Sequence, residues 1–392
     1  MSESLSGTIH GVLEMAVSNG GVPGAVAIVV DRDGPRGVAS AGSTRADGTG
    51  EPLGRDARFR IASMTKAFTS VAALQLVEQG KLGLDEPVAS VLPAWKEVQV
   101  LDGWDGDEPR LREPKTEATI RHLLTHTAGH GYLFFSADLA RYHDVTGTPH
   151  VFVGPRSALT TPLLTEPGTR WEYGINTDWL GLAVEEVSGQ TLDAYLADHL
   201  FNPLGMADTT FTPTADQRAA MMPVHSRTAD GGLAVSDIDL PVAPEWMAGG
   251  HGAFSTADDY GRFVTMLLGD GSAADGGRVL EADTIELAFS NQLGGIPYPD
   301  VIETAVPELT NTVYNLPVGH GWGLGFHLTL DDLEGMRRAG TGDWAGIFNC
   351  YYWVDRASGI GGVFLTQVLP FFDQACVEAA VGVELAAYAD AG

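Results

Sequence analysis

Phe59-Arg60-Ile61-Ala62-Ser63-Met64-Thr65-Lys66 opens a segment with the pattern of a buried helix start. An apolar stripe continues from Ala67 to Val77 at helical spacing, and Gly80 predicts where that helix ends. Ser63 and Lys66 are three residues apart, so on a helix they share a face and the amine lies near the hydroxyl. This arrangement predicts an activated nucleophile, because a serine alcohol needs a neighbouring base to take its proton. The N–H groups at the helix start would stabilise an oxyanion at the same place.

A purely structural interpretation is that Ser63 caps a helix and that Lys66 is a surface lysine. Two observations favour a functional pair. Lysine is scarce, since the chain has only Lys66, Lys81, Lys96 and Lys115 and arginine supplies its other cations. Apolar neighbours also predict that the Lys66 amine is half-buried, which is costly unless the amine is paired or has a lowered pKa.

Composition excludes several classes of function. The 392 residues carry a net charge of −28, from 51 acidic and 23 basic side chains, which argues against nucleic-acid and anionic-membrane partners. The first twenty residues lack a basic segment followed by an apolar one, so no signal peptide is expected, and no stretch is long enough to span a bilayer. Two cysteines, Cys350 and Cys376, do not make a disulfide framework. We therefore expect reduced thiols and a cytoplasmic location, and the sequence leaves open whether the chain forms homo-oligomers.

The order of the predicted elements indicates an α+β fold. Residues 24–31 and 37–42 form an expected β-hairpin, and helical patterns dominate the middle of the chain. Further strands are predicted near the C-terminus, followed by a helix over residues 372–387. The expected strands are residues 321–330, 337–340, 347–354 and 361–368. We predict one sandwich domain from residues 1–95 and 246–392, a mostly helical domain from residues 96–245, and an active site between them.

Two distant segments could complete the chemistry begun by Ser63 and Lys66. One contains Tyr173, in an aromatic cluster, and the other is Trp344-Ala345-Gly346-Ile347 at the start of a predicted strand. Spacing along the chain cannot show whether these segments meet. Tyr132 lies among aromatic residues at a loop-to-helix junction, where a pocket wall and a plain core position are about equally expected.

Competing interpretations as a metal site or another hydrolase fold are weaker. His122, His126 and His130 recur every four residues, but the glutamate of H-E-x-x-H is missing and Gly129 interrupts the helix. The acidic loop that contains Asp102, Asp105 and Asp107 lacks the closing glutamate of a calcium-binding loop. No G-x-S-x-G occurs, which disfavours an α/β-hydrolase. We therefore predict neither a metal nor a cofactor.

Taken together, six segments resemble the serine β-lactamase and penicillin-binding-protein superfamily, and most closely the family VIII carboxylesterases of class C β-lactamase type. The resemblance runs from about residue 20 to residue 370, and the order of the motifs makes it specific. The segments are Phe59 to Lys66, Leu123-Leu124-Thr125-His126-Thr127-Ala128-Gly129, Pro167-Gly168-Thr169-Arg170-Trp171-Glu172-Tyr173, Pro203-Leu204-Gly205-Met206, Ser255-Thr256-Ala257-Asp258-Asp259 and Gly321-Trp322-Gly323-Leu324-Gly325-Phe326.

The resemblance implies a β-lactamase/transpeptidase-like fold, a mainly antiparallel sheet flanked by helices with an inserted helical domain. It also implies that Ser63 is acylated, that Lys66 and Tyr173 handle its proton, and that the backbone N–H groups of Ser63 and Ile347 form the oxyanion hole. Tyr132, Trp344 and Gly346 are the expected substrate-binding residues. Whether Lys66 or Tyr173 is the general base remains open at this point.

Two departures from the β-lactamase pattern decide the predicted substrate. Asn176 comes one place later than the asparagine of Y-x-N, and Trp344 stands where β-lactamases have a lysine for the carboxylate of the antibiotic. The chain is therefore predicted to be a carboxylesterase for small neutral esters. The alternatives are a β-lactamase, a D-amino-acid peptidase or amidase, an acyltransferase of the same fold and, more remotely, a non-catalytic binding protein.

Overall fold

The computed structural model describes residues 1–392 except 243, 274–275 and 392. Its α-helices are α1 Glu3–Ser18, α2 Thr65–Glu78, α3 Val88–Val91, α4 Ile120–Leu124, α5 Ala137–Thr146, α6 Asn176–Ser188, α7 Leu192–Leu196, α8 Asn202–Leu204, α9 Ala215–Ala219, α10 Ala257–Leu268, α11 Ala282–Ala288 and α12 Gln374–Ala391. Its strands are β1 Gly24–Asp31, β2 Gly34–Gly42, β3 Phe59–Arg60, β4 Val100–Asp105, β5 Glu108–Arg112, β6 His225–Arg227, β7 Leu233–Val235, β8 Phe254–Ser255, β9 Val301–Ile302, β10 Val313–Tyr314, β11 His320–Trp322, β12 His327–Thr329, β13 Gly342–Gly346, β14 Cys350–Asp355, β15 Ile360–Leu365 and β16 Val368–Leu369.

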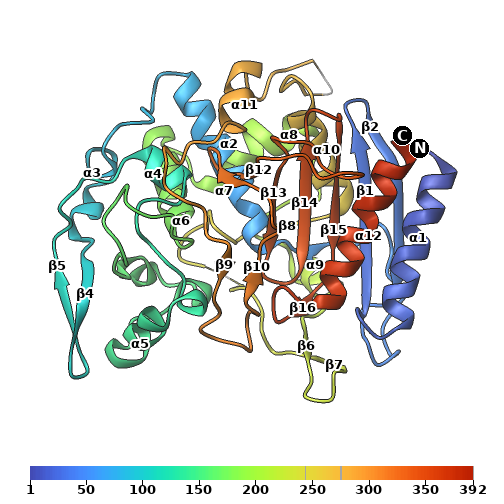
Figure 1. Ribbon diagram of the computed structural model, residues 1–392, viewed down its shortest axis with the longest axis horizontal. Helices are drawn as coiled ribbons and strands as arrows, with labels where there is room; N and C mark the ends of the chain where they lie inside the picture. Colours follow the sequence, from blue (N-terminus) through green and yellow to red (C-terminus); the bar gives the residue numbers. More distant parts are fainter. Residues whose placement is uncertain (243, 274–275, 392) are drawn as a thin grey trace.

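A seven-stranded antiparallel sheet joins the two ends of the chain. Its order is β11-β12-β13-β14-β15-β1-β2, so the N-terminal hairpin pairs with the C-terminal strand β15. Figure 1 shows the blue and red segments side by side, with the two termini close together. The predicted α+β class and the sheet built from both ends of the chain are confirmed.

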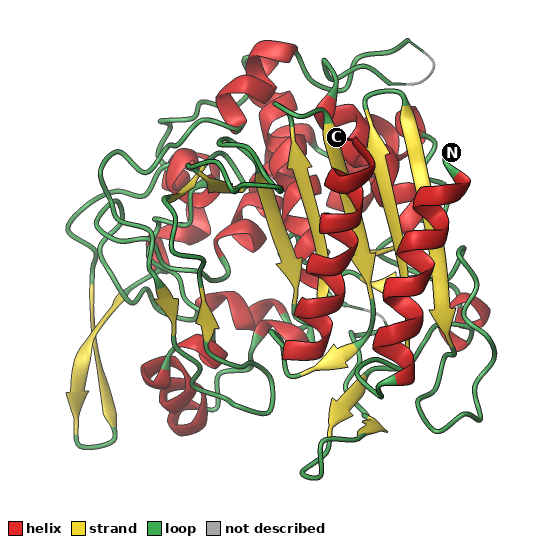
Figure 2. Cartoon of the chain, turned by 45° about the vertical axis from the view of Figure 1, so that its right-hand side comes forward, coloured by secondary structure: helices red, strands yellow, loops and turns green. Residues whose placement is uncertain are grey.

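The strands in the middle of the sheet are buried on both faces, because helices cover each one. Ala25, Ala27 and Val29 of β1 face a core made with α1 and α12. The alternate residues Val26 and Ile28 face the core that contains α2 and α10. Figure 2 shows the two terminal helices lying along one face of the sheet.

The middle of the chain is mostly helical and packs on the α2 side of the sheet. Helix α6 lies against α2, which carries the predicted nucleophile segment. The middle of the chain also contains the β4–β5 hairpin, which projects from the left of Figure 1. The division into two domains stays a prediction.

Three strand predictions near the C-terminus need correction. Residues 321–330 form two short strands, β11 and β12, because the glycine-rich turn between them reverses the chain. Residues 337–340 are not a strand, and β13 begins at Gly342 instead. The Trp344-Ala345-Gly346 motif therefore ends a strand rather than starting one, and β14 begins only at Cys350.

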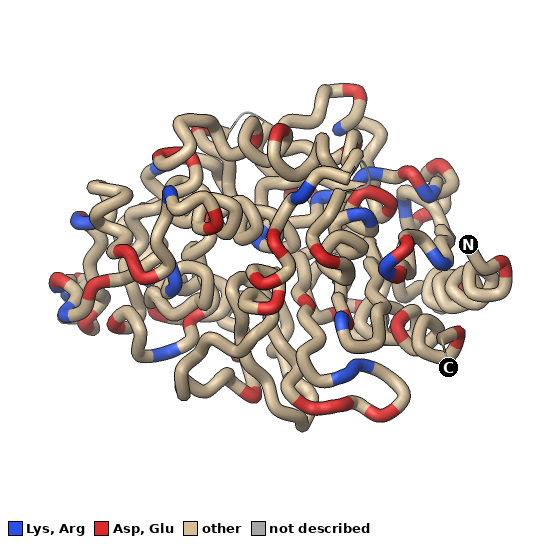
Figure 3. The backbone as a smooth tube through the Cα atoms, turned by 90° about the horizontal axis from the view of Figure 1, so that it is seen from above, with Lys and Arg blue, Asp and Glu red and all other residues tan. Residues whose placement is uncertain are grey.

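Both cysteines are buried and free. Among the described residues, no helix has the length and apolarity needed to cross a membrane. Figure 3 shows acidic positions distributed over the whole tube, as expected from the charge of −28. The cytoplasmic location stays a prediction.

Candidate active site

Ser63 lies in a strained turn directly before α2. Strand β3 leads into a 3-10 turn over Ala62–Met64, and α2 begins at Thr65, so Ser63 is not itself a helix cap. Ala62 has a φ of 43°, a backbone conformation that is costly for a residue with a side chain. The Thr65 hydroxyl donates to the Ala62 carbonyl at 2.6 Å and accepts from the Ala253 N–H at 3.1 Å. These contacts hold the turn, and the turn places Ser63 on the cavity wall.

Lys66 is buried with three polar neighbours. Its Nζ lies 3.1 Å from the Ser63 Oγ, 3.0 Å from the Tyr132 hydroxyl and 2.7 Å from the Gly250 carbonyl. A neutral amine satisfies all three, since its two hydrogens can go to Tyr132 and Gly250 while its lone pair accepts from Ser63. Burial lowers the pKa of Lys66 to about 7, and the Asp178 charge opposes this change. The amine is thus largely neutral above pH 7.

Tyr173 comes from a loop that packs over this pair. Its ring centroid lies 4.8 Å from the Lys66 Nζ, and its hydroxyl accepts a hydrogen bond from the Trp344 indole at 2.9 Å. Burial raises the pKa of Tyr173, although contacts with Ser63 and Trp344 partly offset that effect. The phenol therefore keeps its proton at neutral pH, which suits a proton donor better than a base.

A buried carboxylate that the sequence analysis missed lies behind Lys66. Asp178, in the first turn of α6, is fully buried, and its Oδ1 accepts from the Gly250 N–H at 2.9 Å. Gly250 thus links the carboxylate to the ammonium, and a Cβ at Gly250 would lie 2.6 Å from the Asp178 Oδ2. Burial raises the pKa of Asp178 to about 6, while Lys66 opposes the rise. The only available signal, an acidic residue in a first helical turn, is also that of an ordinary surface helix.

The third motif reaches the site from the end of β13. Gly346 packs so tightly on the serine turn that a Cβ there would lie 2.3 Å from the Ile61 carbonyl oxygen. Trp344 and Ile347 line the same cavity as Ser63. The oxyanion hole formed by the N–H groups of Ser63 and Ile347 stays a prediction.

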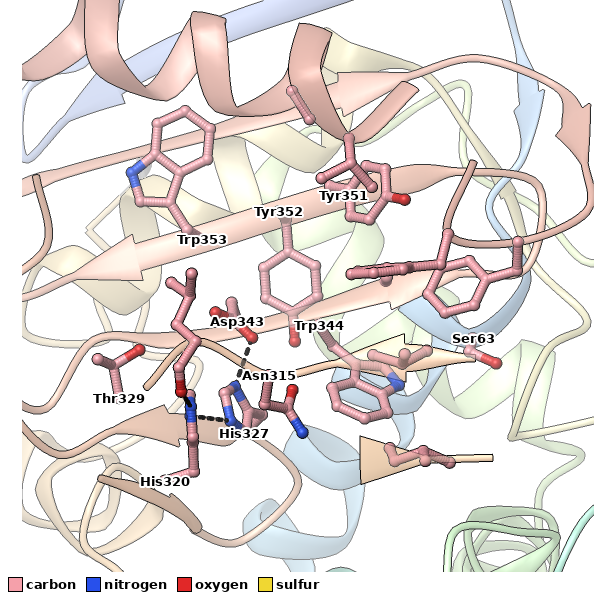
Figure 4. A pocket seen from close by; sticks show the side chains of 18 of the residues that line it. Ser63, Asn315, His320, His327, Thr329, Asp343, Trp344, Tyr351, Tyr352 and Trp353 are labelled. Carbon is pink, nitrogen blue, oxygen red and sulfur yellow. Dashed lines mark hydrogen bonds and ion pairs between the residues drawn. The ribbon is translucent and has the colours of Figure 1, made fainter. Parts of the chain in front are cut away.

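The cavity next to Ser63 has a volume of about 260 Å³ and mainly apolar walls. Figure 4 shows Ser63 at one end, His320 and Asp343 at the other, and Trp344 between them. Asp343 precedes Gly346 by three strand residues, so the cavity extends about 10 Å along β13. Its other walls come from the segment around β10 and from α12.

The structure brings together most of the predicted site residues. Ser63, Lys66, Tyr173 and Trp344 meet, although Tyr173 is 107 positions after Lys66. Tyr132 is buried against Lys66, to which its hydroxyl is hydrogen-bonded, and it is absent from the cavity lining. Its contact with substrate stays a prediction.

The histidine pattern does not converge on an ion. His122 accepts from the Thr119 N–H, His126 pairs with the Asn176 amide at 2.9 Å, and His130 stacks on Trp179. Among the described residues, no group of three or more His, Cys, Asp or Glu side chains could hold a metal ion. Asn176 also donates to the carbonyls of His130 and Glu172, so its amide is directed into the core.

The model of the beta-lactamase family matches residues 9–387. The chain belongs to this family. One relative with a similar sequence is monacolin J acid methylbutanoyltransferase from Aspergillus terreus, which is 32% identical over 95% of this chain and 93% of that protein. Another is lovastatin esterase from Penicillium rubens, 30% identical over 91% of this chain and 92% of that protein.

Solved structures of the family agree with the fold. Simvastatin synthase from Aspergillus terreus superposes with a TM-score of 0.83 at 29% identity, covering 99% of both chains. EstCE1, described as a hydrolase with promiscuous acyltransferase activity, has a TM-score of 0.78 at 25% identity and covers 98% of this chain and 99% of its own. The chain is thus an enzyme of the serine acyl-transferring and hydrolysing type within this family.

Proposed function

We propose that the protein is a carboxylesterase of family VIII type that hydrolyses neutral esters through an acyl-enzyme on Ser63. The observation that carries the proposal is the Lys66 Nζ at 3.1 Å from the Ser63 Oγ, under the Tyr173 ring. A buried amine with a pKa of about 7 can accept the serine proton near neutral pH. This supports Lys66 as the base, the point that sequence reasoning left open.

In the first half of the reaction, neutral Lys66 takes the Ser63 proton while the Oγ forms a bond to the ester carbonyl carbon. The N–H groups of Ser63 and Ile347 would stabilise the resulting oxyanion, an effect worth about 3 to 4 kcal/mol for each donor. The C–O bond to the alcohol then breaks. Tyr173 donates its proton to the leaving oxygen and is reprotonated from the Lys66 ammonium, so the charges balance.

In the second half, the same groups act on the acyl-enzyme. Water loses a proton to Lys66 and forms a bond to the acyl carbon. The bond between the acyl carbon and the Ser63 Oγ then breaks, the Oγ takes up a proton, and the carboxylic acid is released. Replacing that water with a second alcohol would give acyl transfer instead of hydrolysis.

Cavity chemistry favours neutral substrates. Phe134, Phe135, Ile302 and Val313 contribute apolar side chains to the cavity walls. Trp344 stands where a lysine would pair with an antibiotic carboxylate, and its indole N–H is already donated to Tyr173. A substrate carboxylate in this part of the cavity would be desolvated without a partner, which costs several kcal/mol.

The test is pre-steady-state turnover of p-nitrophenyl butyrate. We expect a burst of nitrophenol and a butyryl mass on the peptide that contains Ser63. Ser63→Ala should remove both signals and keep the thermal unfolding temperature, whereas Ser90→Ala, an exposed serine in α3, should keep both. Hydrolysis by folded Ser63→Ala at the wild-type rate would refute the proposal.

A second candidate is an acyltransferase, which the likeness to the methylbutanoyltransferase and to EstCE1 favours. It shares the acyl-enzyme and differs only in what attacks it. Turnover with an added alcohol separates the two, because a transferase yields a new ester in preference to free butyrate. Parallel turnover of nitrocefin tests the remaining β-lactamase alternative.

A further inference from the structure

Five polar side chains that the proposed mechanism does not use line the far end of the cavity. His320 Nδ1 lies 3.0 Å from His327 Nε2, and His327 Nδ1 lies 2.8 Å from the Asp343 carboxylate. Asp343 pairs with Arg337, and Arg337 makes a two-fold ion pair with Glu384 of α12 at 2.6 and 2.9 Å. Figure 4 shows the two histidines and Asp343 joined in one hydrogen-bonded row.

The row of hydrogen-bonded side chains, His320, His327 and Asp343, has a hydrogen-bond acceptor at each end. His320 Nε2 lies 2.8 Å from the Leu316 carbonyl oxygen, which can only accept. The Asp343 carboxylate pairs with Arg337, and an ionised carboxylate can also only accept. The three contacts between these ends each need one hydrogen, but two neutral imidazoles carry only two. Three simultaneous hydrogen bonds therefore require one proton more than two neutral imidazoles carry.

The local charge balance gives the same count. Arg337 contributes one positive charge, whereas Asp343 and Glu384 contribute two negative charges. All three side chains are largely buried, and a buried net charge is unfavourable. One proton on the histidine pair makes the group neutral.

The histidine pair contacts the cavity wall at Leu316, through the hydrogen bond from His320 Nε2 to the Leu316 carbonyl oxygen. Tyr314, Asn315 and Leu316 line the cavity, although the residues Tyr314 and Leu316 are 67% and 53% exposed. Backbone contacts hold the segment on either side, from Asn315 to the Asp300 carbonyl and from Gly319 to the Asp331 carboxylate. Between these anchors, His320 is the side chain that ties the backbone down, at Leu316.

We propose that the protonated His320–His327 pair acts as a latch that holds Leu316 against the cavity and so determines which esters the cavity admits. Loss of one proton removes one of the three contacts. Because the Leu316 oxygen also accepts from the Val318 N–H at 2.8 Å, its contact with His320 can be lost without leaving it unpaired. Bulky esters then enter more easily at higher pH. The selectivity part of this inference rests on the proposed esterase function.

Several groups that face the histidine pair determine the pH at which the pair loses its extra proton. Burial lowers the pKa of both His320 and His327, and the Arg337 charge acts in the same direction. Asp343 and Asp300 favour the proton, and the neutral Tyr298 ring lies 4.9 Å from the His327 ring. Beyond Arg337 lie Glu384 of α12 and, further away, Asp355 and Tyr388. The latch is therefore expected to open on the acid side of the ordinary imidazole pKa.

Asp343→Asn is the decisive variant. An amide can donate to His327 Nδ1, so all three contacts are satisfied by two neutral imidazoles, and the extra proton is no longer needed. Asp300→Asn is the matched control, because it removes a nearby negative charge without changing the hydrogen-bond count. Both substitutions keep the size of the side chain.

The first measurement counts protons without using activity. Imidazole ¹⁵N spectra between pH 5 and 8 should show three N–H groups on the pair at low pH in the wild type and in Asp300→Asn, and two in Asp343→Asn. His320→Gln and His327→Gln assign the signals. Amide exchange of Leu316 and Val318, corrected for intrinsic rates, should increase as the third proton is lost; Pro317 between them has no N–H. Two protons at pH 5 in the wild type, or three in Asp343→Asn, would overturn the proposal.

The second measurement reads selectivity. The ratio of kcat/KM for p-nitrophenyl octanoate to that for the acetate should rise about tenfold across the transition, the size expected for one hydrogen bond to a charged group. The ratio should be independent of pH in Asp343→Asn. A constant ratio in the wild type, with the three-proton signal present, would refute the latch but not the esterase. Absence of all ester turnover would refute the esterase, and the spectra would still decide the proton count.

Discussion

The electrostatic coupling between Asp178 and Lys66 makes a quantitative prediction about the pH dependence of catalysis. If neutral Lys66 is the base, kcat/KM rises as pH increases through its pKa of about 7. Asp178 stabilises the ammonium form, so its carboxylate holds that pKa up. Asp178→Asn removes the charge and keeps an oxygen for the Gly250 N–H. The acid limb of the profile should therefore move to lower pH.

The structure sets the size of the shift. The ammonium and the carboxylate are separated by Gly250, through contacts of 2.7 and 2.9 Å at its carbonyl and N–H. Two such contacts and one residue put the charges at roughly twice a direct ion-pair distance, which gives about 2 kcal/mol at the effective dielectric constant of protein sites. That energy corresponds to about one to two pH units.

The assay is kcat/KM for p-nitrophenyl butyrate from pH 5 to 9, corrected for spontaneous hydrolysis, with thermal unfolding at each pH to confirm the fold. Asp259→Asn is a suitable control, because Asp259 is also a buried carboxylate in a first helical turn but contacts Asp208 and Thr209 instead of the site. Its profile should match that of the wild type. An unmoved limb in folded Asp178→Asn would refute the coupling. A wild-type rate that falls through pH 7 would show that charged Lys66 is the active form.

Three further variants test other parts of the site. Tyr173→Phe should lower kcat by about 10² to 10⁴ and leave KM nearly constant, because it removes only the proton donor; an unchanged kcat would exclude that role. Gly346→Ala should lower kcat at least about tenfold, because its Cβ would lie 2.3 Å from the Ile61 carbonyl oxygen and displace the serine turn, whereas Gly7→Ala, with no atom within 4 Å, should not. Glu384→Gln should reduce the free energy of unfolding in urea by about 3 kcal/mol, since it leaves Arg337 with one carboxylate fewer; a loss no larger than that of exposed Glu378→Gln would contradict this.

Local sequence patterns were sufficient for the elements and for the first part of the site. The β-branched run in residues 24–31 and the helical stripe after Ser63 are local patterns of a few residues, so β1 and α2 were predicted well. The S-x-x-K spacing likewise placed the amine beside the hydroxyl. Strand ends near the C-terminus were less predictable, because turns such as the one between β11 and β12 depend on the neighbouring strands.

Tertiary structure alone decided the electrostatics. Tyr132, Asp178 and Gly250 reach Lys66 from segments 66, 112 and 184 positions away, and no short-range pattern shows that any of them contacts Lys66. A pKa depends on burial and on every charge nearby in space, quantities that the order of residues leaves undefined until the chain packs. The hydroxyl and amine were therefore visible in the sequence, whereas the lowered pKa of the amine and the hydrogen-bonded row of His320, His327 and Asp343 exist only in the folded chain.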